Sequence, residues 1–371
     1  MPPLIDVVYR GPFQGRRVRF VLDALDELGA TQRLFWLNPD PTDEGAARSF
    51  SDFAQQRPAV SLASELDGRA RALLASIRVL RDGSREQASL VVALGFTSLY
   101  AARFVRGPQL LWCINGIPEE RLLYHDSPRH RAAVRSLWAA ARVGRRPETV
   151  LTVSEPMADL VRARIGDTRL LVVPTVVDRA VFRPRPPGPG RMTYMGSGAP
   201  WQDLPLLAET WSALHALDPE LRFKVITKDP RAAILGRGLP ADLVEFVEAR
   251  GPAAVAAELR DSELGFVVRR PHVVNEVSYP TKFGEYVASG VGVVTTDIGW
   301  EIGEMVGSTG CGVLLDVSEP PEAMAARIAE AVAATRTSPA PLVEACDHAA
   351  SMLDRERWVK ELGSTLGGLF G

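Results

Sequence analysis

Short apolar runs rich in valine and leucine recur along the whole chain, and they limit its possible folds more than any other feature. Most are followed by a glycine or polar turn and then by a stretch of helical period, as in residues 5–9 and 18–29. Nearly continuous apolar strands alternating with helices are typical of parallel sheets covered on both faces. The pattern therefore predicts an α/β protein. The predicted strands are residues 5–9, 89–95, 109–114, 149–154, 169–175, 192–198, 221–228, 264–269, 292–297 and 312–316.

A segment rich in proline and glycine, residues 184–190, lies near the middle of the 371-residue chain. Proline fixes φ and lacks an amide donor, so this segment cannot continue a helix or a central strand. A chain of this length also predicts two domains. We therefore expect two Rossmann-like lobes facing across a cleft, over residues 1–185 and 186–350. A C-terminal helix within 351–371 packs back on the N-terminal lobe or on the second one.

The composition excludes several classes of protein. Hydrophobic residues make up 46% of the chain, which excludes wholesale disorder, and no apolar run is long enough for a membrane span. The first residues lack a basic region followed by an apolar run, so we expect no secretory signal. Three cysteines without CxxC spacing fit a cytoplasmic protein. The five histidines form no HExxH motif, so we expect no metal held by the protein.

The formal net charge of −2 conceals two halves of opposite sign. Residues 1–185 contain 27 arginines and 20 acidic residues, a net charge of +7, whereas residues 186–371 carry 16 basic and 25 acidic residues, a net charge of −9. This asymmetry suggests either two lobes that attract one another or a basic lobe that meets an anionic partner. Compositional drift in an arginine-rich proteome is the alternative.

Residues 149–184 contain an ordered series of motif residues. Taken alone, the segment reads as a strand, a helix capped by Ser154 with Glu155 in its first turn, and a second strand. The order and spacing resemble the end of the N-terminal lobe in family-four retaining glycosyltransferases of the GT-B fold. The matching residues are Val153, Ser154, Glu155, Gly166, Pro174, Val177, Asp178, Phe182 and Pro184.

A second segment, residues 265–316, resembles the nucleotide-sugar site of the same family through its core Pro280-Thr-Lys-Phe-Gly-Glu285. A helix that begins near Thr281 can direct its amides at a diphosphate, and Lys282 adds a positive charge there. Glu285, one turn later, can accept hydrogen bonds from ribose hydroxyls. Without the first segment, a surface helix with a Lys–Glu pair would explain this stretch equally well.

The chain departs from the family pattern at four positions. Ser197 stands where the family commonly has arginine, Gln202 lies near the position of a phosphate-binding lysine, and Asn115 replaces a frequent histidine. Glu276 is one residue out of register with the first of two family glutamates. The diphosphate charge must then be balanced elsewhere, by Lys228, Arg269, Arg270 and Lys282.

The resemblance implies a retaining glycosyltransferase that uses a nucleotide-diphosphate sugar, UDP- or GDP-linked, without a tightly bound cofactor or metal. Arg270 and Lys282 are the implied catalytic residues, and Asn115 and Glu119 lie on the acceptor side. The implied donor-binding residues are Gly15, Ser197, Lys228, Arg269, Ser278, Thr281 and Glu285.

Two other functions remain open at this stage. The missing cations at Ser197 and Gln202 would suit a non-catalytic or degenerate nucleotide-sugar-binding protein. The Gly11–Gly15 loop after the first strand would suit a Rossmann oxidoreductase, although it is not GxGxxG and no acidic residue for a nicotinamide ribose is clearly placed. The sequence contains neither the P-loop motif of NTPases nor the GxSxG motif of serine hydrolases.

Residues 128–146 predict a basic amphipathic helix, with Val134, Leu137, Trp138 and Ala141 on its apolar face. Its arginines could contact an anionic acceptor or the inner face of a membrane. The alternative is a core-facing helix whose arginines are solvated. We expect no nucleic-acid partner.

Overall fold

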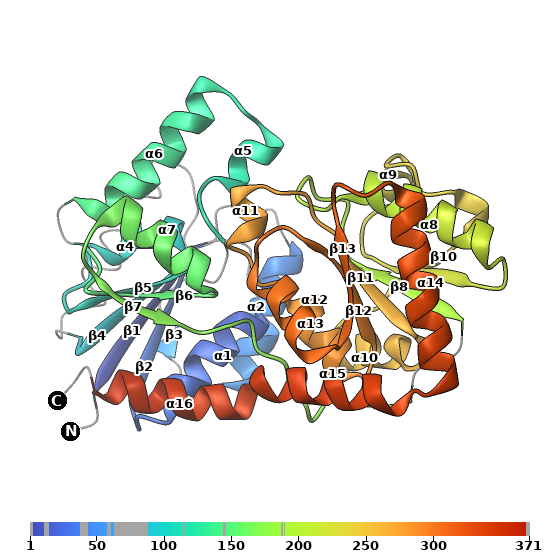
Figure 1. Cartoon of the computed structure of the whole chain (residues 1–371). Coiled ribbons are helices and arrows are strands. Elements are labelled where there is room, and N and C mark those ends of the chain that lie inside the picture. Colours follow the sequence, from blue (N-terminus) through green and yellow to red (C-terminus); the bar gives the residue numbers. More distant parts are fainter. Residues whose placement is uncertain are drawn as a thin grey trace. The chain divides into compact units, whose positions relative to one another are not determined.

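The computed structural model describes residues 3–10, 15–37, 44–57, 61–62, 88–113, 116–143, 146–186, 188 and 190–368. The chain forms two compact units (Figure 1). The first comprises Met1–Val173 with Glu356–Gly371, and the second comprises Pro174–Arg355.

The division between the units falls before Pro174, ahead of the expected boundary after residue 185. Residues 174–186 run along the second unit, where the amide of Val177 donates to the carbonyl of Leu353 at 2.9 Å and that of Arg185 to the carbonyl of Ser289 at 3.3 Å. The Pro/Gly-rich segment therefore lies inside the second unit, because its extended backbone finds hydrogen-bond partners there.

The first unit contains a parallel sheet with strand order β3-β2-β1-β4-β5-β6-β7. The strands are β1 (Leu4–Arg10), β2 (Thr31–Leu37), β3 (Ser61–Leu62), β4 (Leu90–Leu94), β5 (Gln109–Trp112), β6 (Thr149–Thr152) and β7 (Arg169–Val172). The helices are α1 (Gly15–Asp26), α2 (Glu44–Gln56), α4 (Phe96–Ala102), α5 (Glu120–Tyr124), α6 (Pro128–Arg142), α7 (Glu155–Ile165) and α16 (Arg355–Gly367). Most of α16 belongs to this unit, and Gly363 packs so closely on α1 that a Cβ there would lie 3.1 Å from the carbonyl oxygen of Ala24.

The second unit contains a parallel sheet with strand order β10-β9-β8-β11-β12-β13. The strands are β8 (Arg191–Met195), β9 (Arg222–Ile226), β10 (Val244–Val247), β11 (Leu264–Val267), β12 (Gly292–Asp297) and β13 (Gly312–Asp316). The helices are α8 (Leu204–Leu217), α9 (Arg231–Leu235), α10 (Pro252–Glu258), α11 (Val273–Glu276), α12 (Thr281–Ala288), α13 (Glu301–Thr309), α14 (Pro321–Thr337) and α15 (Ala340–Met352), with a short 3₁₀ helix η2 (Leu259–Asp261) after α10.

Both faces of the second sheet carry buried side chains. Phe223 and Phe266 pack in one core with α8 and α14, which lie side by side (Figure 1). On the opposite face, the ring of Tyr286 from α12 lies against Gly265, where a Cβ would clash with it. Successive side chains of a strand point to opposite faces, so both faces must be apolar.

All ten predicted strands are present, as is the α/β architecture of two Rossmann-like units. Ser154 caps α7 as predicted, accepting a hydrogen bond from the amide of Met157 at 3.1 Å, and Gly166 ends the helix with φ 82°. The ten predicted strands do not include β2, β3 or β10; of these, β3 has two residues and β10 is a short edge strand with partly exposed side chains. Helix α6 ends at Arg142, earlier than the predicted residue 146.

Within the described ranges, no helix has both the length and the hydropathy needed to cross a membrane.

Candidate functional site

The strand order of the second unit places a candidate binding site between β8 and β11. The sheet grows outward from β8 in one direction through β9 and in the other through β11, so the crossovers reverse there. In open α/β sheets, ligands bind beyond the carboxyl ends of strands at such a switch point. The segments that follow these two strands are residues 196–203 and 268–272.

The segment after β8 is held by hydrogen bonds to its backbone. The Tyr194 hydroxyl donates to the carbonyl of Ser197 at 2.7 Å, and the amide of Gly198 donates to Oδ2 of Asp229 at 2.7 Å. Asp229 follows β9, so a neighbouring strand fixes the position of this segment. Ser197 thus occupies a fixed turn but supplies no positive charge.

Lys282 of α12 approaches the backbone of this segment closely. A Cβ at Gly196 would collide with Nζ of Lys282 and with the hydroxyl of Tyr194, so glycine leaves room for the lysine. Nζ also lies 5.6 Å from the centroid of the Tyr194 ring, within the range of a cation–π contact. The amine of Lys282 is therefore positioned at the end of β8.

The electrostatic environment of Lys282 is unusual. Its pKa is lowered to about 7, first by burial and then by the positive charge of Arg269, while the carboxylates of Glu285 and Asp229 act in the opposite direction. A lysine with this pKa changes charge near neutral pH. An anion bound beside it would favour the charged form.

Lys282 belongs to the first turn of helix α12. Thr281 is its first residue, after Pro280, and the first amides of a helix have no acceptor within the helix. These amides and the helix dipole favour an anion. Glu285 lies one turn further along and is 7% exposed. The predicted start of the helix and the placement of Lys282 and Glu285 on it are confirmed.

Arg269 and Arg270, which follow β11, differ in exposure and in hydrogen-bond partners. Arg269 is buried, and its guanidinium donates to the carbonyl of Trp201 at 3.1 Å and to Oδ1 of Asn275 at 3.0 Å. The Arg270 side chain is 65% exposed, and its Nε donates to Asp203, the residue that caps α8. Arg269 therefore fixes the segments around the switch point, and Arg270 lies at its accessible edge.

The remaining predicted donor residues are less directly involved. The Ser278 hydroxyl donates to the carbonyl of Asn275 at 2.8 Å, which stabilises the turn before α12. Lys228 is exposed beyond the end of β9. Gly15 begins α1 in the first unit.

The predicted acceptor-side residues lie in the first unit. Both carboxylate oxygens of Glu119 accept from Nε1 of Trp138, at 2.9 and 3.1 Å, and Arg164 donates to Oε1 at 3.2 Å. Glu119 therefore links the start of α5 to α6 and α7. Asn115 lies outside the described residues.

Sequence reasoning missed three residues at the site, Gly196, Asp229 and Asn275. Asp229 follows a predicted strand directly, and a carboxylate at the carboxyl end of a parallel strand is a usable signal. Asn275 both accepts from Arg269 and donates to the carbonyl of Arg270 at 2.9 Å, which no local pattern indicates.

In the part of the chain that the structure describes, no three His, Cys, Asp or Glu side chains cluster so as to hold a metal ion.

Part of the chain matches a known protein family. Residues 189–334 match the family model described as "Glycosyl transferases group 1". The sequence has no significant match among curated proteins.

The fold is that of GT-B glycosyltransferases. Sucrose-phosphate synthase from Thermosynechococcus elongatus is similar with a TM-score of 0.72 and 14% identity, covering 100% of this chain and 99% of the other. Anabaena HepE in complex with UDP-glucose has the same score and identity, with 99% and 100% covered. WaaG, a glycosyltransferase involved in lipopolysaccharide biosynthesis, has a TM-score of 0.65 and 12% identity, with 99% of each chain covered.

The lowered pKa of Lys282 can be measured directly, because the chain has four lysines, at positions 224, 228, 282 and 360. Reductive ¹³C-methylation followed by NMR should give a lysine methyl resonance with a midpoint near pH 7 that Lys282→Met removes, whereas the resonance of the methylated α-amine, a group with a pKa of about 7.7–8.0, stays in the variant. If the resonance that Lys282→Met removes titrates above pH 9, the environment described for Lys282 is wrong.

Proposed function

We propose that this protein is a retaining glycosyltransferase that moves a sugar from a nucleotide-diphosphate sugar to an acceptor hydroxyl. One observation carries the proposal: the amine of Lys282, a residue in the first turn of α12, lies against the Gly196 backbone at the switch point of the second unit. The segment that matches the glycosyltransferase family model contains this site. The Anabaena HepE structure, which shares the fold, contains UDP-glucose.

The proposed mechanism is electrostatic. Lys282 and the first amides of α12 stabilise the negative charge that develops on the departing diphosphate, while Arg270 adds a charge from the accessible edge of the site. Preorganised donors of this kind need no rearrangement during the reaction. The acceptor hydroxyl attacks from the face that the diphosphate leaves, which retains the anomeric configuration.

The other residues bind and position the donor. Glu285 accepts hydrogen bonds from the ribose hydroxyls, and carboxylate acceptors suit such paired donors. Arg269 holds the segments after β8 and β11 through Trp201 and Asn275. The second unit binds a UDP- or GDP-linked sugar, and the first unit binds the acceptor.

This donor site works against the charge of its surroundings. Residues 186–371 carry a net charge of −9, which would repel a nucleotide diphosphate at long range. Binding therefore depends on local groups, above all Lys282 and the α12 amides, whose effect is short-ranged.

The family match favours a transferase over an oxidoreductase. The only support for the oxidoreductase hypothesis was the Gly11–Gly15 loop, most of which lies outside the described residues. No described feature therefore favours hydride transfer, and we do not propose it. A degenerate, non-catalytic protein would bind the donor yet transfer no sugar, and an assay of sugar transfer or donor hydrolysis separates it from an enzyme.

Exposed arginines on α6 support an anionic or membrane-associated acceptor. Arg129 and Arg135 on α6 are exposed, whereas Arg131 pairs with Asp126 at 2.6 Å. Tyr124, just before α6, is 52% exposed. WaaG, which shares the fold, is involved in lipopolysaccharide biosynthesis.

Membrane contact through α6 would be electrostatic. Its apolar residues, including Leu137 and Trp138, are buried in the first unit, so they cannot enter a bilayer. The arginines remain for contact with anionic headgroups, at about 1 kcal/mol each.

Substitutions on α12 should weaken nucleotide binding. Lys282→Met removes the charge beside the diphosphate, and Glu285→Ala removes the ribose acceptor, so each should lower the affinity for UDP or GDP by tenfold or more, as ~1.5–3 kcal/mol per charged hydrogen bond implies. The measurement is calorimetric titration at pH 7. Lys360→Met, an exposed substitution of equal charge on α16, should change nothing. Equal affinity in the parent and both α12 variants would contradict the site.

Replacing Arg129, Arg131 and Arg135 with alanine should abolish co-sedimentation with anionic liposomes at low salt. The loss of roughly 3 kcal/mol is more than 100-fold in binding. A control with three exposed arginines replaced elsewhere, Arg162, Arg250 and Arg327, should still bind. If the parent protein itself does not sediment with these vesicles, the membrane proposal fails while the donor site is unaffected.

A further inference from the structure

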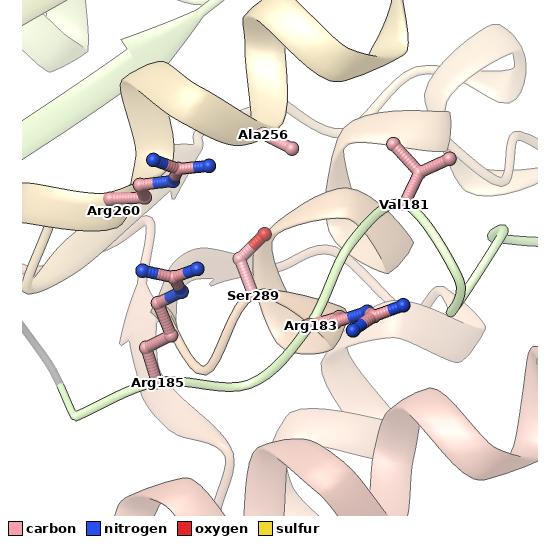
Figure 2. Close-up of a pocket in the computed structure, with 6 residues that line it drawn as sticks. All are labelled: Val181, Arg183, Arg185, Ala256, Arg260 and Ser289. Atoms are coloured by element: carbon pink, nitrogen blue, oxygen red, sulfur yellow. The ribbon is translucent and has the colours of Figure 1, made fainter.

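A cavity in the second unit is lined by three arginines. Its volume is about 220 Å³, and its lining residues are Val181, Arg183, Arg185, Ala256, Arg260 and Ser289 (Figure 2). In Figure 2 the side chain of Arg185 extends toward the guanidinium group of Arg260, and the Ser289 hydroxyl lies to one side of the two groups. Arg183 points away, and its Nε donates to the carbonyl of Ala180 at 3.1 Å.

The backbone that carries Arg185 is fixed on this side of the cavity. Its amide donates to the carbonyl of Ser289 at 3.3 Å. A Cβ at Gly290, which has φ 76°, would lie 2.5 Å from the carbonyl oxygen of Arg185. The segment around Arg185 is therefore packed directly onto the end of α12.

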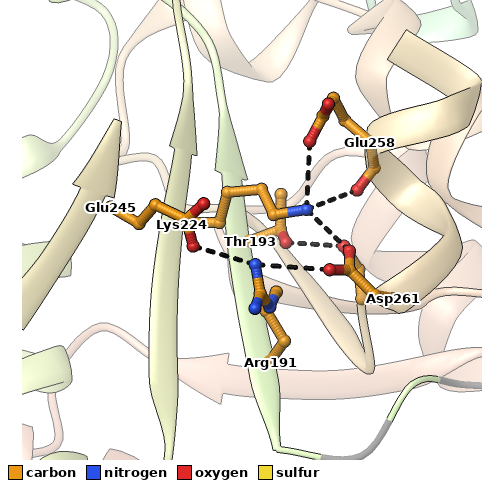
Figure 3. A network of polar contacts seen from close by, with 7 residues as sticks. Arg191, Thr193, Lys224, Glu245, Glu258 and Asp261 are labelled. Atoms are coloured by element: carbon orange, nitrogen blue, oxygen red, sulfur yellow. Dashed lines mark hydrogen bonds and ion pairs between the residues drawn. The ribbon is translucent and has the colours of Figure 1, made fainter. Parts of the chain in front are cut away.

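The backbone that carries Arg260 is fixed by a polar network (Figure 3). Lys224, buried on β9, donates to the carbonyl of Glu258 at 2.7 Å and to Oδ1 of Asp261 at 2.6 Å. Arg191 lies 3.2 Å from Oδ2 of Asp261 and donates to Oε2 of Glu245 at 2.8 Å. The residues on both sides of Arg260 are thus held in place.

Because of this network, neither Glu258 nor Asp261 pairs with an arginine of the cavity. The carboxylates of Glu258 and Asp261 are already paired with Lys224 and Arg191. Among the described residues, no carboxylate forms an ion pair with Arg185 or Arg260. Two like charges that line one cavity repel, and an anion bound between them would turn this repulsion into attraction.

We propose that this cavity binds a small phosphate-bearing anion, held between the guanidinium groups of Arg185 and Arg260. Guanidinium groups match phosphate oxygens in charge and geometry, and each can donate two parallel hydrogen bonds. The cavity is smaller than the roughly 300–1,000 Å³ of sites for drug-sized ligands, so it suits a small anion.

This site is distinct from the proposed donor site. Ser289 follows the last residue of α12, whereas Lys282 lies in its first turn. At a rise of 1.5 Å per residue the two positions are about 10 Å apart along the helix. The inference therefore does not depend on the proposed function.

Calorimetric titration of the full chain with inorganic phosphate, at constant ionic strength in chloride buffer, tests the proposal. The parent should show saturable binding, and the double variant Arg185→Ala/Arg260→Ala should bind at least about tenfold more weakly. The control double variant Arg250→Ala/Arg327→Ala removes the same charge from exposed arginines paired with Glu248 and Glu319. It should bind like the parent.

Three outcomes would overturn the proposal: no saturable binding by the parent up to millimolar phosphate, equal losses in both double variants, or a loss in Lys282→Met without one in Arg185→Ala/Arg260→Ala. The third outcome would place the ion at the donor site and leave the proposed function intact. Thermal unfolding in chloride buffer should be the same for the parent and the two double-arginine variants, because the substituted arginines are exposed.

Discussion

The close approach of Lys282 to the backbone at Gly196 is the contact on which the candidate donor site depends. It requires a glycine at the end of β8, a helix that begins at Thr281, and a sheet that places both at one switch point. Burial and the charge of Arg269 lower the pKa of this lysine to about 7. In the unbound protein this environment makes the charged form of Lys282 less favourable in free energy, and a bound anion would offset that cost.

Much of the fold could be predicted from the sequence, because buried parallel strands are nearly continuous apolar runs. The cap at Ser154 and the start of α12 were predictable for a similar reason, since local chemistry determines them. The boundary between the units was not, because the hydrogen bonds of Val177 and Arg185 join residues distant in sequence. Tertiary pairing, rather than proline content, decides which unit holds residues 174–186.

The candidate site was predictable in part. Motif spacing selected Lys282 and Glu285, and the structure places both on α12 beside the switch point. Spacing could not decide between Arg269 and Arg270, because the orientation of a side chain just beyond a strand end depends on partners such as Asn275 and Asp203. Nor could it reveal that Glu119 bonds Trp138 and Arg164, or that Arg185 and Arg260 share a cavity.

Although residues 186–371 carry a net charge of −9, the second unit contains two separate groups of cations. One is Lys282 with Arg269 and Arg270 at the switch point, and the other is Arg185 with Arg260 at the cavity. Anion binding would depend on these local groups rather than on the net charge.

A crystal structure of the protein with UDP tests the central claim most directly. The account predicts the diphosphate between the Gly196 backbone and the first turn of α12, within hydrogen-bonding distance of Lys282 Nζ. Nucleotide bound at the strand ends of the first unit, with the β8–β11 switch point empty, would contradict it.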